Sequence, residues 1–311
     1  MNPTAGNGGR FFYRYYFNVC DHHDCQNGTC GADKTSARGY RCNCVESYGG
    51  ENCEVRVCDS HVCMNGGLCE ADQTSARGYK CNCFYGYVGD SCEVLAIDCK
   101  VYRDIGYTES GVYSIYPFGP SSESVRTYCD METLDGGWTA IQNRINESVS
   151  FERNWADYRI GFGGPEHSFW IGNDAIHQLT KGNDSSLYVT IKLRDGRTLY
   201  ELYDRFLVSS ETENYQLFLG GPASGTLGDG MLHTQDNIFD LSGMYFSTFD
   251  KDNDRSGSNC AEFYRGGWWF NACFNAFLNG PWAMEDWAYP WFPTVLSGED
   301  VMETRMMVKR L

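Results

Sequence analysis

The sequence predicts an α+β globular domain preceded by two small disulfide-rich β-hairpin modules. Of the 16 cysteines, 12 precede residue 93, and they form two sets of six with residue gaps of 4, 4, 11, 1, 8 and 4, 5, 11, 1, 8. The stretch 99–311 is poor in cysteine, rich in aromatic residues and glycine, and mixes strand-like with helix-like patterns. A length of 311 residues allows about two domains of ordinary size.

The two modules, 20–53 and 58–92, are near copies of each other. They contain the words ADKTSARGYRCNC and ADQTSARGYKCNC, and each has only 34 or 35 residues. A unit this small cannot bury enough apolar surface to fold alone, so crosslinks must stabilise it, and losing one disulfide costs about 2–5 kcal/mol. Zinc is the competing interpretation. It is disfavoured because the close cysteine pairs are C-x-C and each set numbers six rather than four.

This spacing, with aromatic-glycine loops such as CFYGYVGDSC (83–92), resembles epidermal growth factor-like (EGF-like) modules. Spacing alone allows 15 pairings for six cysteines. The resemblance implies pairing first to third, second to fourth and fifth to sixth. In this sequence the implied pairs are Cys20–Cys30, Cys25–Cys42, Cys44–Cys53, Cys58–Cys69, Cys63–Cys81 and Cys83–Cys92. The stretches before the first cysteines, FNVC and VRVC, lack acidic residues, so we interpret both modules as calcium-free spacers or protein-contact units.

Within 99–311, the strand and helix signals are mixed. SLYVTIKL (186–193) and TLYELYDRFLV (198–208) alternate as strands do, with an Asp-Gly pair between them as a hairpin turn. SFWIGNDAIHQLT (168–180) predicts a helix capped by Asn173 or Asp174. These patterns favour one α+β domain.

The same region resembles the fibrinogen C-terminal (fibrinogen-related) domain along its whole length. The matching words are DGGWT (135–139), FWIGNDAIHQLT (169–180), YFSTFDKDND (245–254), NCAEFYRGGWWFNACF (259–274) and LNG (278–280). The resemblance implies the disulfides Cys99–Cys129 and Cys260–Cys273, which leaves none of the 16 cysteines unpaired.

The loop DKDNDRSGSNC (250–260) concentrates three aspartates. An EF-hand is excluded, because positions 6 and 12 of such a loop would be Arg255 and Ala261 instead of glycine and glutamate. The remaining alternatives are a solvated acidic turn and the calcium loop that the resemblance implies. In that loop Ca²⁺ would be held by the carboxylates of Asp252 and Asp254 and the backbone carbonyls of Ser256 and Ser258, with Gly257 supplying unusual backbone angles.

In the lectin branch of this family, the ficolins and tachylectins, a pocket beside the calcium loop recognises acetyl groups. The resemblance implies that the corresponding pocket residues here are Tyr264, Ala272, Cys273, Phe274, Trp287 and Tyr289. It also implies an unusual cis peptide bond between Ala272 and Cys273. The sequence departs from the lectin pattern at Phe274, where lectins commonly have histidine, and over 281–300, which is unusually aromatic. The aromatic residues of that stretch either complete the core or face a ligand.

Cysteine usage predicts a secreted, extracellular protein. Residues 1–19 show no signal peptide, so we expect this segment to be truncated or disordered. The Asn-x-Ser/Thr sequons predict glycosylation at Asn27, Asn146 and Asn183. The net charge of −16 argues against a nucleic-acid partner. The sequence contains no run of about 18 apolar residues, so we expect no membrane-spanning helix. It also contains no catalytic motif, so we do not expect an enzyme.

Two functions are therefore weighed. The first is a calcium-dependent lectin of innate immunity that binds acetylated carbohydrates or cell-surface glycans. The second is an extracellular-matrix or receptor-binding adhesion protein without sugar specificity, as in tenascin- and angiopoietin-like proteins. We favour the lectin on the calcium loop and Tyr264, while EGF-like modules favour the alternative. Weak single-site binding also predicts a homo-oligomer.

Overall fold

The computed structural model describes residues 18–45, 48–59, 63–72, 74–75, 77–182, 185–232, 239–282, 290–297 and 300–311. It divides into two units. Unit 1 comprises residues 1–84 and 90–93, and unit 2 comprises residues 85–89 and 94–311. Among the described helices, none is long and apolar enough to cross a lipid bilayer.

Unit 1 is built from two-stranded antiparallel hairpins. The pairs are β1 (Gly28–Ala32) with β2 (Tyr40–Cys44), β3 (Tyr48–Gly49) with β4 (Val55–Arg56), and β5 (Leu68–Ala71) with β6 (Tyr79–Asn82). The two copies also share an internal bond. The side-chain amide of Asn27 donates to the carbonyl of Cys53 at 3.0 Å, and that of Asn65 donates to Cys92 at 2.8 Å. The sequence repeat is therefore a repeat of hydrogen bonds as well as of residues.

All 16 cysteines lie within the described residues, and all are paired. The eight disulfides are the eight that the two resemblances imply: Cys20–Cys30, Cys25–Cys42, Cys44–Cys53, Cys58–Cys69, Cys63–Cys81, Cys83–Cys92, Cys99–Cys129 and Cys260–Cys273. Six of them crosslink the modules, which have little apolar core of their own.

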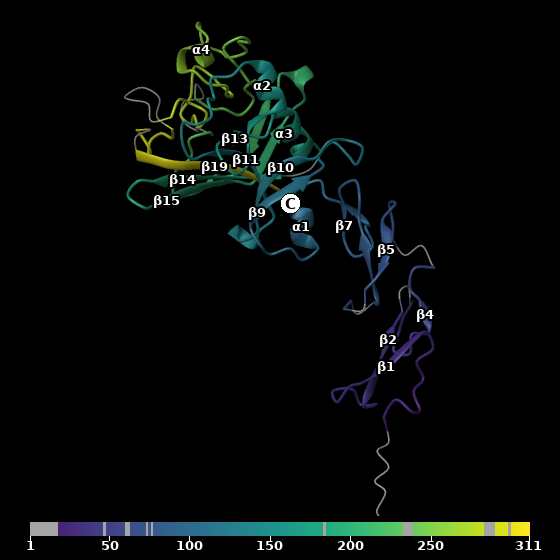
Figure 1. Ribbon diagram of the computed structural model, residues 1–311. Coiled ribbons are helices and arrows are strands. Elements are labelled where there is room, and N and C mark those ends of the chain that lie inside the picture. The colour runs from purple at the N-terminus through teal and green to yellow at the C-terminus, as the bar shows by residue number, and fades with distance from the viewer. Residues whose placement is uncertain are drawn as a thin grey trace, which may run out of the picture. The chain divides into compact units, whose positions relative to one another are not determined.

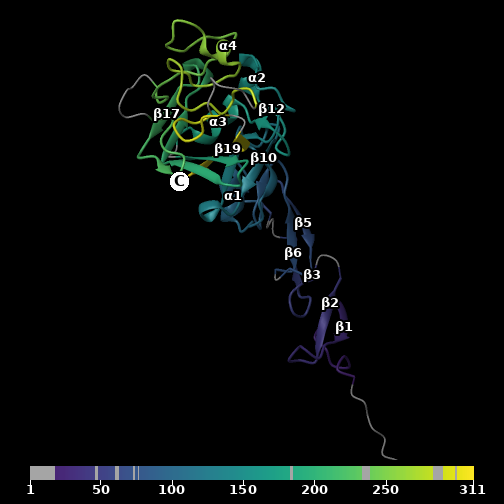
Figure 2. The same ribbon diagram turned by 90° about the vertical axis from the view of Figure 1, so that its left-hand side faces the viewer.

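Unit 2 is organised around a nine-stranded sheet (Figures 1 and 2). Its order is β12-β13-β11-β19-β14-β15-β18, while β10 pairs with β11 and β9. The strands are β9 (Gly111–Ile115), β10 (Val125–Asp130), β11 (Trp138–Arg144), β12 (Phe162–Gly163), β13 (Phe169–Trp170), β14 (Ser185–Leu193), β15 (Thr198–Tyr203), β18 (Ser224–Gly225) and β19 (Val301–Arg310).

The remaining elements of unit 2 are short. In both views α2, α3 and α4 lie on one side of β19 and α1 lies on the other (Figures 1 and 2). The helices are α1 (Cys99–Asp104), α2 (Trp155–Ile160), α3 (Asn173–Thr180) and α4 (Cys260–Tyr264), and the 3-10 turns are η1 (Thr133–Asp135) and η2 (Glu211–Glu213). Two small hairpins pair β7 (Tyr87–Val88) with β8 (Val94–Leu95) and β16 (Arg205–Val208) with β17 (Leu217–Gly220).

Aromatic side chains fill the core of unit 2. Trp268 and Trp269 are fully buried, and Trp269 lies 5.2 Å from Phe246 and 6.0 Å from Trp170, measured between ring centroids. β14 buries Leu187 and every second residue after it to Leu193, as its alternating pattern predicts. Rings of this size account for much of the apolar surface that the domain removes from water.

Two local expectations need correction. The predicted strand 198–208 is two strands, because the backbone leaves the large sheet at Asp204 and continues as β16 in a separate hairpin. The predicted helix forms as α3, but neither Asn173 nor Asp174 caps it, and its N-cap is Gly172. Both side chains bond elsewhere: Asn173 accepts from the Trp170 indole N–H at 2.9 Å, and Asp174 accepts from the hydroxyl of Tyr215 at 2.6 Å.

The hairpin β7–β8, which begins within the second cysteine repeat and ends after it, falls in unit 2. The N–H of Ala96, which is fully buried in the unit 2 core, donates to the carbonyl of Gly86 at 2.9 Å, and the N–H of Tyr116 donates to the carbonyl of Ala96 at 2.8 Å. A side chain at position 86 would collide with the Tyr116 ring. Glycine is therefore required where the backbone passes under that ring.

Candidate binding face and calcium loop

The side chain of Asn259 links the loop 248–259 to the start of α4. Its Oδ1 accepts from the N–H of Glu262 at 3.0 Å and so caps the helix. Its Nδ2 donates to the carbonyls of Thr248 and Phe249, both at 3.2 Å. A single asparagine thus holds both ends of the acidic loop together.

The three aspartates of this loop have different roles. Asp250 bonds within the protein, since its Oδ1 accepts from the N–H of Trp155 at 2.9 Å and from the hydroxyl of Thr248 at 2.7 Å. The ammonium group of the next residue, Lys251, lies 3.6 Å from the centroid of the Trp155 ring. Asp250 therefore joins the loop to the start of α2, which explains its place in the pattern without a metal ion.

Asp252 and Asp254 face each other. Asp254 accepts from the N–H of Ser256 and from the N–H of Cys260, both at 2.8 Å, and Asp252 accepts from the N–H of Asp254 at 3.1 Å. Burial raises the pKa of Asp254, and contact with the Asp252 carboxyl raises it further, although the two backbone bonds act in the opposite direction. Two carboxylates in contact repel each other unless a cation or a proton neutralises them.

The donor set of the loop fits a hard divalent cation. Besides the two carboxylates, the carbonyls of Ser256 and Ser258 accept no backbone N–H from the described residues, so their oxygens are available as ligands. Among the described residues, no three histidine, cysteine or acidic side chains are grouped so that they could hold a metal ion by themselves, so a metal here needs such carbonyls or water. Gly257 does not adopt a left-handed φ, contrary to the expectation that it supplies unusual backbone angles.

Beyond the loop, Cys260 on α4 is joined to Cys273, and the Ala272–Cys273 peptide bond is cis. Of the residues that the lectin resemblance places in a pocket, the structure brings Tyr264 and Phe274 together, with ring centroids 4.7 Å apart in an edge-to-face contact. Phe274 is buried and also packs on Phe277, 4.9 Å away. Phe274 is therefore a core residue, while Ala272 is exposed. Trp287 and Tyr289 lie outside the described residues, as does Asn183.

Buried polar side chains support the segment that follows. Gln142 on β11 donates to the carbonyl of Leu278 at 3.1 Å and contacts the Asn279 side chain at 3.3 Å. Arg144, on the same strand, donates to the carbonyl of Gly280 and lies over the rings of Phe151 and Trp282. Burial lowers the pKa of Arg144 to about 10. These bonds attach the segment to strand β11 of the large sheet.

The sequence does not indicate that two aromatic side chains on this face are exposed. Phe249, at the start of the loop, is 44% exposed, and Phe263, on α4, is 62% exposed. Their backbones are linked through Asn259, which bonds Phe249 and caps the helix of Phe263. Patterning cannot tell them from core residues, because a buried phenylalanine, Phe246, lies three positions from Phe249 and another, Phe270, lies seven positions from Phe263.

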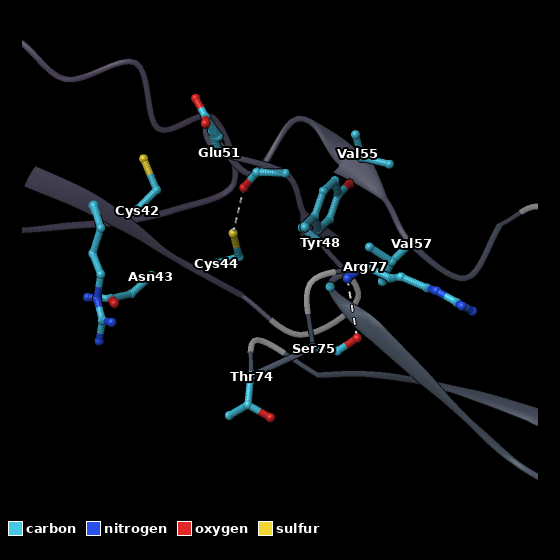
Figure 3. A pocket seen from close by; sticks show the side chains of 14 residues that line it. Cys42, Asn43, Cys44, Tyr48, Glu51, Val55, Val57, Thr74, Ser75 and Arg77 are labelled. Carbon is cyan, nitrogen blue, oxygen red and sulfur yellow. Dashed lines mark hydrogen bonds between the residues drawn. The ribbon is translucent and has the colours of Figure 1, made fainter. Parts of the chain in front are cut away.

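A cavity of about 620 Å³ lies in unit 1 (Figure 3). Tyr48, Val55 and Val57 contribute its apolar lining, with Thr74 and Ser75 across from them. Two of its charged side chains have partners inside the unit: Glu51 pairs with Arg38 and Arg77 pairs with Asp90. The cavity contains none of the ligand residues expected from the sequence.

Comparisons with known proteins agree with this architecture. The family model for the C-terminal globular domain of the fibrinogen beta and gamma chains matches residues 95–291. Fibroleukin of Bos taurus is 44% identical over 180 residues, which is 58% of this chain and 40% of fibroleukin. Angiopoietin-2 of Homo sapiens is 37% identical over 218 residues, which is 66% of this chain and 41% of angiopoietin-2.

Solved structures show the same fold. The fibrinogen-like globe domain of human ANGPTL6 matches with a TM-score of 0.61 at 32% identity, covering 69% of this chain and 95% of that domain. The corresponding domain of human ANGPTL2 matches with a TM-score of 0.61 at 32% identity, covering 68% of this chain and 98% of that domain.

The fold and the loop define a fibrinogen-like globular protein with a disulfide-rich N-terminal region, whose cysteine pairs are consistent with EGF-like modules. More particularly, the protein belongs to the family defined by the C-terminal globular domain of the fibrinogen beta and gamma chains. It spans about two fifths of the length of the curated relatives it matches.

The prediction of an innate-immune lectin for acetylated carbohydrates is wrong. The relatives and solved structures named above are fibroleukin, angiopoietin-2 and angiopoietin-like globe domains, and they favour the alternative of a receptor-binding or adhesion protein. This chain carries the acidic loop and Tyr264 and is nevertheless similar to these relatives, so those residues do not by themselves identify a lectin.

Proposed function

We propose that this protein is part of a secreted, non-enzymatic recognition protein whose fibrinogen-like domain binds a protein receptor or matrix component. The relatives named above support this class of function. The disulfide content supports an extracellular setting, since such bonds persist in oxidising compartments. The net charge of −16 supports a protein rather than a nucleic-acid partner.

The observation that carries the proposal is the pair of exposed phenylalanines, Phe249 and Phe263. Covering a large apolar side chain with a partner removes apolar surface from water without breaking hydrogen bonds, and aromatic side chains are frequent anchors of protein interfaces. The surrounding loop is held by the bonds of Asn259 and by the Cys260–Cys273 disulfide. A constrained loop loses little conformational entropy on binding.

Calcium would keep this face in one shape. Asp252 and Asp254 would hold the ion with the carbonyls of Ser256 and Ser258, and its charge would relieve the repulsion between the two carboxylates. The ion supplies structure rather than chemistry, because the loop presents no base placed to activate a bound water.

Among the glycosylation sites expected from the sequence, the surroundings favour Asn146. It is exposed, and its Oδ1 accepts from the N–H and the hydroxyl of Ser148, which leaves the amide nitrogen outside this turn. Asn27 is half-buried, and its amide nitrogen already donates to the carbonyl of Cys53. Asn65 makes the equivalent bond without being part of a sequon, so the bond serves the fold.

The test is binding of the full protein to cultured cells treated beforehand with either a protease or a glycosidase mixture. We expect protease treatment, and separately EDTA, to abolish binding, and glycosidase treatment to leave it. Phe249→Ser and Phe263→Ser should each weaken binding at least fivefold. Phe118→Ser is the matched control, since Phe118 is 46% exposed and belongs to neither the loop nor α4. Binding that resists protease but is lost after glycosidase treatment would contradict the proposal.

A further inference from the structure

The hairpin β16–β17 carries a second feature, independent of the face around α4. A cavity of about 430 Å³ lies on it, lined by residues of both strands and by Ser185 at the start of β14. The strand β17 is labelled in Figure 2. The volume falls in the range of small-molecule sites, roughly 300–1,000 Å³.

The apolar part of the cavity comes from the outer face of the hairpin. Phe206 and Leu219 are paired in register and buried, so they face the core. The neighbouring register pair, Leu207 with Phe218, is on the opposite face, because side chains alternate along a strand. Phe218 is 44% exposed. The outer face therefore presents an apolar pair to solvent where a solvated hairpin would ordinarily carry polar side chains.

One charged side chain flanks this apolar pair. Arg205 is opposite Gly220 in the register, and its aliphatic carbons would lie 3.5–4.0 Å from a Cβ placed at position 220, within ordinary van der Waals contact. Within the described part of the protein its guanidinium makes no ion pair. An unpaired cation beside an apolar surface, on a protein of net charge −16, selects for an anionic ligand.

A buried hydroxyl provides the second polar group. Ser185 is 1% exposed and lines the cavity, and its Oγ has no hydrogen-bond partner among the described residues. Buried polar atoms are nearly always bonded, because leaving one unsatisfied costs about 1–3 kcal/mol. A ligand oxygen in this cavity would satisfy it.

We propose that this cavity binds a small carboxylate-bearing amphiphile, with its apolar tail on Leu207 and Phe218 and its carboxylate paired with Arg205. The hydroxyl of Ser185 donates a hydrogen bond to the ligand. The site does not involve α4 or the acidic loop, so it can be filled while the other face is engaged.

The experiment uses the full protein with its disulfides intact and two probes whose chains each contain ten carbons, counting the carboxylate carbon of decanoate. Isothermal titration calorimetry compares decanoate with decyltrimethylammonium, both below the concentrations at which they form micelles. We expect decanoate to bind at least tenfold more tightly than the cation. Arg205→Gln should weaken decanoate binding at least fivefold, and Phe218→Ser should weaken it by a similar factor. Arg153→Gln, which changes an exposed arginine paired with Asp157, should have no effect.

Three outcomes would overturn the proposal. The first is equal affinity for the two probes, which would indicate unspecific apolar binding. The second is unchanged decanoate affinity in Arg205→Gln. The third is a dimer in sedimentation velocity that Phe218→Ser dissociates, with no decanoate binding, which would assign this face to a second copy of the protein.

Discussion

Replacing Asn259 separates the two functions that the structure gives this side chain. Asn259→Ala removes the cap of α4 and both bonds from Nδ2 to the carbonyls of Thr248 and Phe249. A lost cap costs about 1 kcal/mol. The two amide bonds, which are partly exposed, together contribute about 1 kcal/mol. We therefore expect Asn259→Ala to lower the free energy of unfolding by about 2 kcal/mol.

Asn259→Ser is the internal control, because a serine hydroxyl caps a helix about as well as asparagine but cannot reach out as an amide donor. It should cost about 1 kcal/mol, half the loss in the alanine variant. Arg255→Gln, an exposed change on the same loop, should stay within about 0.5 kcal/mol of the unsubstituted protein.

Urea unfolding followed by tryptophan fluorescence measures these differences. All eight tryptophans lie at or after residue 138, so the signal reports the fibrinogen-like domain without the cysteine-rich modules. If Asn259→Ser is as unstable as Asn259→Ala, the cap contributes nothing. If Asn259→Ala unfolds like the unsubstituted protein, the loop is not held by this residue and the argument for a constrained binding face fails.

Three further predictions concern other parts of unit 2. Calcium should raise the unfolding temperature at pH 7, and this effect should disappear as the pH falls. The loss should begin at a higher pH than for an ordinary carboxylate, because the pKa of Asp254 is raised. Asp254→Asn should abolish the calcium effect, and a calcium-dependent rise in unfolding temperature that survives in this variant would place the ion elsewhere. Burial also raises the pKa of Glu201, so the folded state binds this proton more tightly than the unfolded state does, and the free energy of unfolding should fall as the pH rises through the raised pKa. Urea unfolding between pH 4 and 8 should therefore show a weaker pH dependence of stability in Glu201→Gln than in the unsubstituted protein. Parallel pH profiles for the two proteins would refute this. Tyr116→Ala should lower the free energy of unfolding by about 1–2 kcal/mol by uncovering Gly86, and an unchanged urea midpoint would show that the β7–β8 hairpin does not contribute to the domain.

Several features of the fold follow directly from residue patterns. The two cysteine repeats indicate crosslinked modules, since short units without a core need such bonds, and the alternation in 186–193 predicts β14. Helix α3 is also predicted, but its cap is not. The cap differs because both side chains bond elsewhere: Asn173 accepts from Trp170, three residues earlier, and Asp174 accepts from Tyr215, 41 residues later, a partner that no local pattern reveals.

The candidate site divides in the same way. The acidic loop is visible in the sequence as a run of carboxylates, yet only the fold shows that Asp250 is committed to the N–H of Trp155, 95 residues earlier in the sequence. The resemblance to lectin sequences assigns Phe274 to the wall of a pocket, but in the fold Phe274 is buried and packs against Phe277. Exposure of Phe263 is likewise a property of the assembled surface, because neighbouring phenylalanines of the same local pattern are buried.

The sequence by itself determined the family, the disulfide framework that the resemblance implied, and the location of the acidic loop. Covalent spacing and short motifs act over a few residues, so they can be read directly from residue order. Tertiary structure decided which aspartates remain available, which aromatic rings face solvent and which unit holds the β7–β8 hairpin. These depend on contacts between segments distant in sequence, such as Gly86 with Tyr116, and such contacts exist only once the core has formed.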